Sequence, residues 1–284
     1  MKPIAPNPFF NRHRITDPAY FYGRAGHVEQ IYSAIVTRQS RSIVGERKLG
    51  KSSLLTYAMQ PTVMQNYDLD PARYVFIYLD LEAMTSATRP EFWLEIVEQC
   101  YGQLDDQGLR RRFDRYLDQD DDMRFTSVRR LLRRVRDAGL QVVCMLDEFE
   151  CLAENKLFTL TFYGKLRSLA SEMGVVYLTG SKRSLYDLTY HHSGTLSSPF
   201  FNIFSELPLG LMNEDEGRQL LHQLSALGKE PLSAEAVEYA LELAGPHPFF
   251  LQIAGFCLAE RDGLPGKAMR DGFTEAVADH FHYL

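Results

Sequence analysis

Short apolar runs alternate with amphipathic segments through the first two thirds of the chain. The runs are rich in β-branched residues and are bounded by polar or glycine positions, as strands are. They predict strands at residues 41–45, 74–81, 141–147, 174–180 and 204–209. In the segment before the third run, Val128, Leu131, Leu132 and Val135 follow the helical period, with arginines on the other side. This alternation indicates an α/β domain with a mainly parallel five-stranded sheet.

The strand pattern stops after about residue 210, and helical segments follow. Asn213 and Ser233 are suited to cap two of them, a third begins near Pro248, and a fourth covers about residues 273–282. The chain contains no internal repeat and no low-complexity linker. We therefore expect a small helical domain packed against the α/β domain.

These patterns divide the chain into three parts. We expect an N-terminal arm over residues 1–30, the α/β domain over residues 31–210, and the helical domain over residues 211–284. A chain of this length is near the practical limit for one core, so a large domain with a smaller companion is a reasonable division.

Composition narrows the functional classes. Of the 284 residues, 45% are hydrophobic and 24% charged, which is typical of a globular protein with a real core. The formal net charge of -6 disfavours a protein dedicated to nucleic acid or to anionic membranes. The N-terminus has no signal-peptide pattern, and no apolar run is long enough to span a bilayer. We expect a cytoplasmic protein.

The strongest chemical signal is the pattern G-x-x-x-x-G-K-S at residues 45–52, directly after the first predicted strand and before a helical segment. In such a loop, backbone N–H groups and a helix N-terminus surround phosphates, Lys51 reaches the outer phosphates, and the Ser52 hydroxyl ligates Mg²⁺. The alternative is an ordinary glycine-rich turn. The residues predicted to bind nucleotide here are Gly45, Glu46, Arg47, Lys48, Leu49, Gly50, Lys51, Ser52 and Ser53.

A second signal is the buried run at residues 142–146, which ends in Asp147 and Glu148. Ligands of open α/β sheets bind at the carboxyl ends of the strands, where this acidic pair lies. We expect Asp147 to hold the Mg²⁺ shell and Glu148 to be the catalytic residue that polarises the attacking water. Taken alone, such a pair is most often a solvated strand end; the phosphate loop upstream favours the catalytic interpretation.

The strand at residues 74–81 lies between the two motifs in sequence, which suggests that the acidic strand is not the immediate neighbour of the phosphate-loop strand. The fourth strand then leads to Ser181 and Arg183. This arrangement resembles the additional-strand, catalytic-glutamate division of P-loop NTPases, in which polar residues after the fourth strand sense the terminal phosphate. Ser181 or Arg183 would be that sensor; the alternative is a solvated loop.

The base is expected to be adenine. Guanine-specific proteins usually contain an N-K-x-D tetrad, whereas the nearest match, Asn155-Lys156-Leu157-Phe158, has Phe in place of the acid. We therefore expect ATP and ADP, with Mg²⁺, as ligands.

Taken together, these stretches resemble the bacterial signal-transduction ATPases of the STAND branch, which are related to AAA+ proteins. The resemblance covers residues from about 7 to 250. It depends on the order of Asn7-Pro8-Phe9, Asp17-Pro18, Phe21-Tyr22-Gly23-Arg24, GERKLGKSSLL, LDEFE, LTGSKRSL, Ser198 to Phe204 and Gly245-Pro246-His247-Pro248-Phe249-Phe250.

The resemblance implies specific roles. Phe21, Gly23 and Arg24 would border the adenine, and Pro248, in a helical lid formed by residues 211–284, would touch the nucleotide from the other side, so that ATP-Mg²⁺ lies between the α/β domain and the lid. It also implies an ADP-locked resting state, slow hydrolysis of ATP to ADP and phosphate, and an ATP-bound signalling state that self-associates.

Two departures from the family pattern are visible. The family often has an acidic residue soon after the F-x-G-R arginine, whereas Ala25-Gly26-His27 follows here. Family members also usually continue into a winged-helix domain and then into sensor or effector domains. This chain stops at Leu284, which makes it either a fragment of a longer protein or a minimal form.

The sequence therefore favours a nucleotide-dependent molecular switch with ATPase activity. Two alternatives stay open: a ring-forming AAA+ ATPase that acts on nucleic acid, and a nucleotide-binding scaffold that does not hydrolyse. Fast turnover stimulated by DNA would favour the first alternative, and tight retention of ADP would favour the switch. The stimulus and the effector cannot be deduced from the residues.

Overall fold

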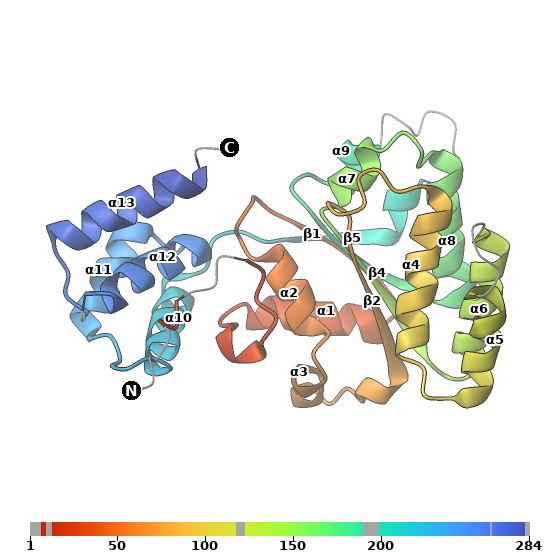
Figure 1. The fold of residues 1–284 in the computed structure, drawn as a ribbon, viewed down its shortest axis with the longest axis horizontal. Coiled ribbons are helices and arrows are strands. Elements are labelled where there is room, and N and C mark those ends of the chain that lie inside the picture. Colours follow the sequence, from red (N-terminus) through yellow and green to blue (C-terminus); the bar gives the residue numbers. More distant parts are fainter. Residues whose placement is uncertain (1–6, 10–12, 118–122, 190–198, 262, 282–284) are drawn as a thin grey trace. The chain divides into compact units, whose positions relative to one another are not determined.

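The computed structural model separates the chain into two compact units, which are described individually (Figure 1). The sheet unit contains His27–Glu46 and Ala58–Leu209, and the helical unit contains Met1–Gly26, Arg47–Tyr57 and Gly210–Leu284. The structure describes residues 7–9, 13–117, 123–189, 199–261 and 263–281.

The sheet unit is built on five parallel strands in the order β2-β3-β4-β1-β5 (Figure 1). The strands are β1 (Ser40–Val44), β2 (Tyr74–Asp80), β3 (Gln141–Asp147), β4 (Val176–Ser181) and β5 (Phe204–Pro208). Each strand coincides with a predicted one to within two residues at either end. The predicted parallel α/β sheet is therefore confirmed.

The strand order separates the two motif-bearing strands. β4 lies between β1, which leads into the phosphate loop, and β3, which ends in the acidic pair. The two strands are therefore not neighbours, as the sequence suggests. The separating strand is β4, whereas β2, which precedes β3 in sequence, forms the edge of the sheet.

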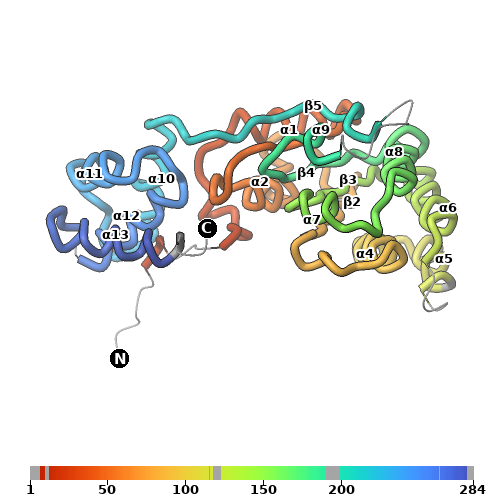
Figure 2. Tube along the Cα trace, turned by 90° about the horizontal axis from the view of Figure 1, so that it is seen from above, coloured from red at the N-terminus to blue at the C-terminus, as the bar shows by residue number. Residues whose placement is uncertain are grey.

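Helices cover both faces of the sheet (Figures 1 and 2). α1 (Ala25–Val36) and α3 (Pro61–Asn66) lie on one face, and α4 (Arg89–Gly102), α6 (Phe125–Asp137) and α8 (Leu160–Met173) lie on the other. Because both faces are covered, a central strand such as β3 is apolar almost throughout. The other elements of this unit are η2 (Pro71–Arg73), α5 (Gln107–Leu117), α7 (Phe149–Glu154), α9 (Leu185–Thr189) and η4 (Phe200–Ile203).

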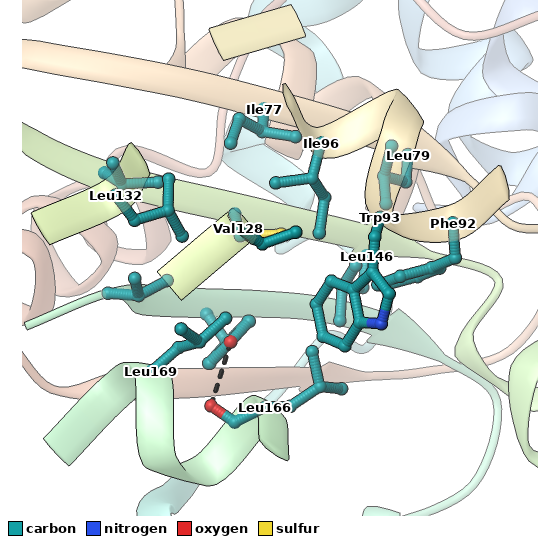
Figure 3. Close-up of a cluster of buried hydrophobic side chains, with 14 of the residues drawn as sticks. Ile77, Leu79, Phe92, Trp93, Ile96, Val128, Leu132, Leu146, Leu166 and Leu169 are labelled. Atoms are coloured by element: carbon teal, nitrogen blue, oxygen red, sulfur yellow. Dashed lines mark hydrogen bonds between the residues drawn. The ribbon is translucent and has the colours of Figure 1, made fainter. Parts of the chain in front are cut away.

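A large apolar core fills the space between the sheet and the layer of α4, α6 and α8 (Figure 3). Trp93 of α4 is 2% exposed and packs with its ring centroid 5.1 Å from that of Phe162 in α8. The predicted apolar stripe of α6 faces this core and is fully buried. The sheet side is formed by Ile77 and Leu79 of β2 and by Leu146 of β3. This core includes residues near the carboxyl ends of β2 and β3, among them Leu79 and Leu146.

The helical unit contains the four C-terminal helices. Asn213 caps α10 and Ser233 caps α11, as predicted. The Asn213 side chain accepts the Glu216 N–H at 2.8 Å, and Glu216 returns the bond to complete a capping box. The fourth helix begins earlier than predicted because Met269 and Phe273 are both buried, one turn apart. The elements of this unit are η1 (Pro18–Tyr20), α2 (Lys51–Ala58), α10 (Glu214–Ala226), α11 (Ala234–Ala244), α12 (Pro248–Ala259) and α13 (Lys267–Phe281).

Across the described residues, every helix is too short or too polar to cross a bilayer.

The N-terminal arm contributes to the core of the helical unit. Phe9 is completely buried, and its ring lies against the backbone of α12 at Gly255. A Cβ atom at position 255 would overlap that ring, so glycine is required for the arm to pack here. Phe9 of the N-P-F stretch thus has a packing role in the core of the helical unit.

We predict that Gly255→Ala lowers the free energy of unfolding by about 1–3 kcal/mol, because the added methyl group overpacks the contact with Phe9. Gly164→Ala in α8 is the control, since a methyl group there meets no atom within 4 Å. We expect the control to be stabilised by up to about 1 kcal/mol, as for other alanine-for-glycine changes in helices. Urea unfolding followed by circular dichroism measures both; equal effects would contradict the packing role of Phe9.

Candidate nucleotide-binding site

The phosphate loop leaves the sheet at a position that only glycine can occupy. The Gly45 N–H donates to the carbonyl oxygen of Ser181 at 3.1 Å, at the carboxyl end of β4. A Cβ atom on Gly45 would overlap the carbonyl oxygen of Leu209. The first glycine of the motif is therefore required by the close approach of two backbone segments.

Further along, the loop turns through left-handed backbone conformations. Lys48 has φ 62° and Gly50 has φ 95°, and such turns direct successive N–H groups toward one point. α2 then begins at Lys51, and its first regular bond runs from the Leu54 N–H to the Gly50 carbonyl oxygen at 2.8 Å. The first N–H groups of a helix have no acceptor within the helix and favour anions. The loop thus has the backbone of a phosphate site.

The buried side chain of Arg24 connects several segments of the helical unit. Its side chain is 5% exposed, and its guanidinium donates to the carbonyl oxygens of Gly210 at 2.5 Å, Leu211 at 3.3 Å and Leu49 at 3.5 Å. Burial lowers the pKa of Arg24, and the charge of Glu216 opposes this shift. Arg24 therefore ties the phosphate loop to the segment that leads into α10.

Glu216 supplies the acidic partner that the sequence lacks after Arg24. Its Oε1 accepts the backbone N–H of Arg24 at 2.7 Å, while its Oε2 accepts the Asn213 N–H at 3.1 Å in the capping box. Gly23 packs so closely on Met212 that a Cβ atom would overlap it. The capping-box spacing was visible in the sequence, but the contact across 192 residues was not.

The G-P-H-P motif meets the phosphate loop within the same unit. His247 caps α12 by accepting the Phe249 N–H at Nδ1, at 3.3 Å, and burial lowers its pKa, which favours the neutral ring. Pro248 is the first residue of α12, as expected. The Lys48 ammonium lies 4.8 Å from the centroid of the Phe249 ring. This places the start of α12 beside the loop.

The N-terminal arm also contacts α2. The ring of Phe21 stacks on that of Tyr57 with centroids 4.1 Å apart. The Ser53 hydroxyl accepts the Ile15 N–H at 2.9 Å, and the Thr56 hydroxyl donates to the Ile15 carbonyl oxygen at 2.8 Å. The hydroxyl of Ser53, predicted to bind nucleotide, is therefore engaged by the arm.

In the sheet unit, the acidic pair lies at the carboxyl end of β3. Asp147 is 2% exposed, and its Oδ2 accepts the hydroxyl of Tyr78 on β2 at 2.6 Å. Glu148 has φ 50° and ψ 52°, a left-handed conformation that costs a non-glycine residue about 1–2 kcal/mol. Strain of this kind is concentrated at functional sites. Sequence reasoning missed Tyr78 because it read β2 only as an apolar strand.

The proposed sensor residues lie at the carboxyl end of β4. Ser181 is fully buried, and its hydroxyl donates to the carbonyl oxygen of Arg183 at 2.8 Å. The Arg183 side chain is 60% exposed, with its guanidinium 3.9 Å from the Glu154 carboxylate. The Lys182 N–H donates to Oε1 of Glu150 at 3.0 Å. Glu150, which follows the acidic pair on α7, is a second residue that sequence reasoning missed.

The predicted residues thus fall into two groups. Those in the sheet unit gather at the carboxyl ends of its strands: Gly45, Glu46, Asp147, Glu148, Ser181 and Arg183. Those in the helical unit lie on the N-terminal arm, the loop with α2, and α12: Phe21, Gly23, Arg24, Arg47, Lys48, Leu49, Gly50, Lys51, Ser52, Ser53 and Pro248.

A phosphate loop after β1, an acidic pair after β3 and the position of β4 between these strands define a P-loop NTPase of the AAA+ type. The model of one family, the novel STAND NTPase 2 family, matches residues 29–264. The chain belongs to this family. It is therefore a nucleotide-binding P-loop NTPase of the STAND/AAA+ type.

Solved structures share the fold at low sequence identity. The ORC2 protein of Aeropyrum pernix, in ADPNP–ADP complexes, is 12% identical, with a TM-score of 0.68 over 99% of this chain and 75% of that one. The Walker-type ATPase paby2304 of Pyrococcus abyssi is 15% identical, with a TM-score of 0.67 over 96% and 77%. Domain III of the Thermotoga maritima replication initiation protein DnaA is 14% identical, with a TM-score of 0.52 over 93% and 98%.

No curated protein matches the sequence significantly.

We predict that Tyr78→Phe lowers the free energy of unfolding by about 1.5–3 kcal/mol, because it removes a hydrogen bond to a buried carboxylate. Tyr74→Phe, on the same strand, is the matched control, and we expect it to stay within about 0.5 kcal/mol of the parent. Chemical denaturation measures both variants. Equal stability of the two would show that the Tyr78 hydroxyl does not hold Asp147.

Proposed function

We propose that this protein is a molecular switch that binds ATP with Mg²⁺, hydrolyses it slowly to ADP and phosphate, and changes the state of its helical lid with the nucleotide. One observation carries the proposal. In the helical unit, the F-x-G-R arm, the phosphate loop and the G-P-H-P helix contact one another through Arg24, Lys48 and Phe249. Three motifs far apart in sequence thus converge.

The roles of the binding residues follow from their chemistry. The loop N–H groups and the start of α2 would hold the phosphates, and Lys51, which is 4% exposed, would supply a positive charge with little competition from water. Phe21, Gly23 and Arg24 would border the adenine. Pro248 would contact the nucleotide from α12.

The oxygen donors fit Mg²⁺. A serine hydroxyl at the start of a helix and a buried aspartate are hard oxygen ligands of the kind this ion prefers, and we assign it to Ser52 and Asp147. When bound, the ion would neutralise negative charge on the phosphates. Tyr78 would fix the orientation of Asp147 by donating to Oδ2. A ligand held by a second hydrogen-bonding residue is better oriented.

Glu148 is the residue we assign to hydrolysis. Its carboxylate would orient the attacking water and accept a proton from it. The left-handed backbone at Glu148 starts α7 directly after Asp147. Ser181 and Arg183, at the end of β4, would respond to the terminal phosphate, and the exposure of Arg183 leaves its guanidinium accessible to a ligand.

Switching follows from differential affinity. A ligand shifts a conformational equilibrium only as far as it binds one state better than the other. The G-P-H-P helix belongs to the lid and also lies beside the phosphate loop, so a change of nucleotide would be sensed there. In this proposal the ATP-bound protein self-associates, and an effector responds to the state of the helical lid.

A second candidate function has specific support from the structural neighbours. The Aeropyrum pernix ORC1 protein, with a TM-score of 0.58, was solved in complex with DNA. An AAA+ ATPase that acts on nucleic acid is therefore the alternative to a switch. DNA-stimulated turnover would favour this alternative, whereas turnover unchanged by DNA would favour the switch.

We predict that Lys51→Ala weakens binding of both ATP and ADP at least tenfold, or about 1.4 kcal/mol, because it removes the motif cation from the phosphates. Lys229→Ala, at an exposed lysine of the same unit, is the control and should bind like the parent. Isothermal titration calorimetry measures both. Parental affinity in Lys51→Ala would refute the assignment of the phosphate loop.

We predict that Glu148→Gln still binds ATP but hydrolyses it roughly 100-fold more slowly, because the amide keeps the shape of the side chain and cannot accept the proton. Calorimetry gives the affinity, and phosphate release under saturating ATP gives the rate. Equal turnover in variant and parent would move the catalytic role to another residue.

A further inference from the structure

Glu150 connects the acidic turn to the end of the neighbouring strand. It lies on α7, two residues after Glu148, and its Oε1 accepts the backbone N–H of Lys182 at 3.0 Å. Its other oxygen, Oε2, is buried and has no hydrogen-bond partner within the described part of the chain. The carboxylate is thus committed to one backbone amide in the turn that contains Ser181 and Arg183.

This arrangement is costly if its only purpose is stability. Glu150 is half-buried, but its Oε2 atom is buried and loses hydration that the hydrogen bond of the other oxygen does not replace. The packing of α7 does not need it, because Phe149 and Leu152, 0% and 2% exposed, already anchor the helix in the core. An unsatisfied buried group in such a place calls for a functional explanation.

The bond completes a continuous chain of contacts at the carboxyl edge of the sheet. Glu150 holds the N–H of Lys182, and the Ser181 hydroxyl closes the same turn by donating to the Arg183 carbonyl oxygen. The Ser181 carbonyl oxygen in turn accepts the N–H of Gly45, where the phosphate loop begins. The strained Glu148 turn and the first residue of the loop are therefore linked through the end of β4.

We propose that Glu150 is a positioning residue for hydrolysis that fixes the turn at residues 181–184 relative to Glu148. Ser181 and Arg183, which would sense the terminal phosphate, thereby keep their position relative to Glu148, which would orient water. The inference rests on the proposed ATPase function. Glu150 acts through the backbone of Lys182 and not on the nucleotide, so its loss should lower kcat and leave nucleotide affinity unchanged.

The test compares three variants of the full chain. Glu150→Ala removes the acceptor, Glu150→Gln keeps an amide oxygen that accepts the same N–H, and Glu98→Ala changes an exposed glutamate on α4 as a control. Steady-state phosphate release gives kcat and KM, calorimetry gives the Kd of ADP, and hydrogen exchange reports on the Lys182 amide.

We expect Glu150→Ala to lower kcat at least tenfold, to leave KM and the Kd of ADP within twofold, and to speed exchange of the Lys182 amide at least tenfold. Glu150→Gln should restore kcat to within threefold of the parent, and Glu98→Ala should match the parent. If Glu150→Ala does not fold, Glu150→Asp, which withdraws the carboxylate by one methylene group, should show the same selective loss of kcat.

Three results would overturn the inference. Parental kcat in Glu150→Ala, despite faster exchange at Lys182, would show that the bond does not serve the chemistry. Parallel loss of kcat, ADP affinity and thermal stability in both Ala and Gln variants would show a purely structural role. Unchanged exchange at Lys182 would show that the bond is absent. A parent that turns over no ATP would instead refute the proposed function, and the exchange measurement would still test the bond.

Discussion

The contacts of the Arg24 guanidinium organise the helical unit. A buried cation is costly unless its donors are occupied, and here three carbonyl oxygens accept from it. Those carbonyls belong to the phosphate loop, at Leu49, and to the segment entering α10, at Gly210 and Leu211. Because Glu216 also accepts the backbone N–H of Arg24, the arm, the loop and α10 can move only together or by breaking this set of bonds.

In the sheet unit, the polar residues of the proposed site lie at the carboxyl ends of the strands. When helices cover both faces of a parallel sheet, the central residues of its strands are buried and apolar. Polar side chains therefore gather where the strands end. Tyr78 steadies Asp147, and Glu150 steadies the turn after β4. Glu148, with its left-handed backbone, lies in sequence between Asp147 and Glu150. The proposed chemistry thus depends on two residues to which the sequence analysis assigned no role, Tyr78 on β2 and Glu150 at the end of the LDEFE stretch.

Much of the fold could be predicted because its signals are local. Apolar runs, helical patterns, the G-x-x-x-x-G-K-S loop and the cap at Asn213 each lie within a short stretch of consecutive residues. The missed contacts are not local: Tyr78 is 69 residues from Asp147, and Arg24 is 192 residues from Glu216. Which side chains meet at a strand end depends on the strand order, and a single sequence does not show that β4 lies between β1 and β3.

The release rate of ADP tests the switch most directly. It is measured by displacing a fluorescent ADP analogue from the purified protein and is compared with steady-state turnover under the same conditions. A switch locked by ADP predicts that ADP co-purifies with the protein and that its release rate constant matches the turnover number, because release limits the cycle. Release much faster than turnover, with no nucleotide retained on purification, would contradict the account.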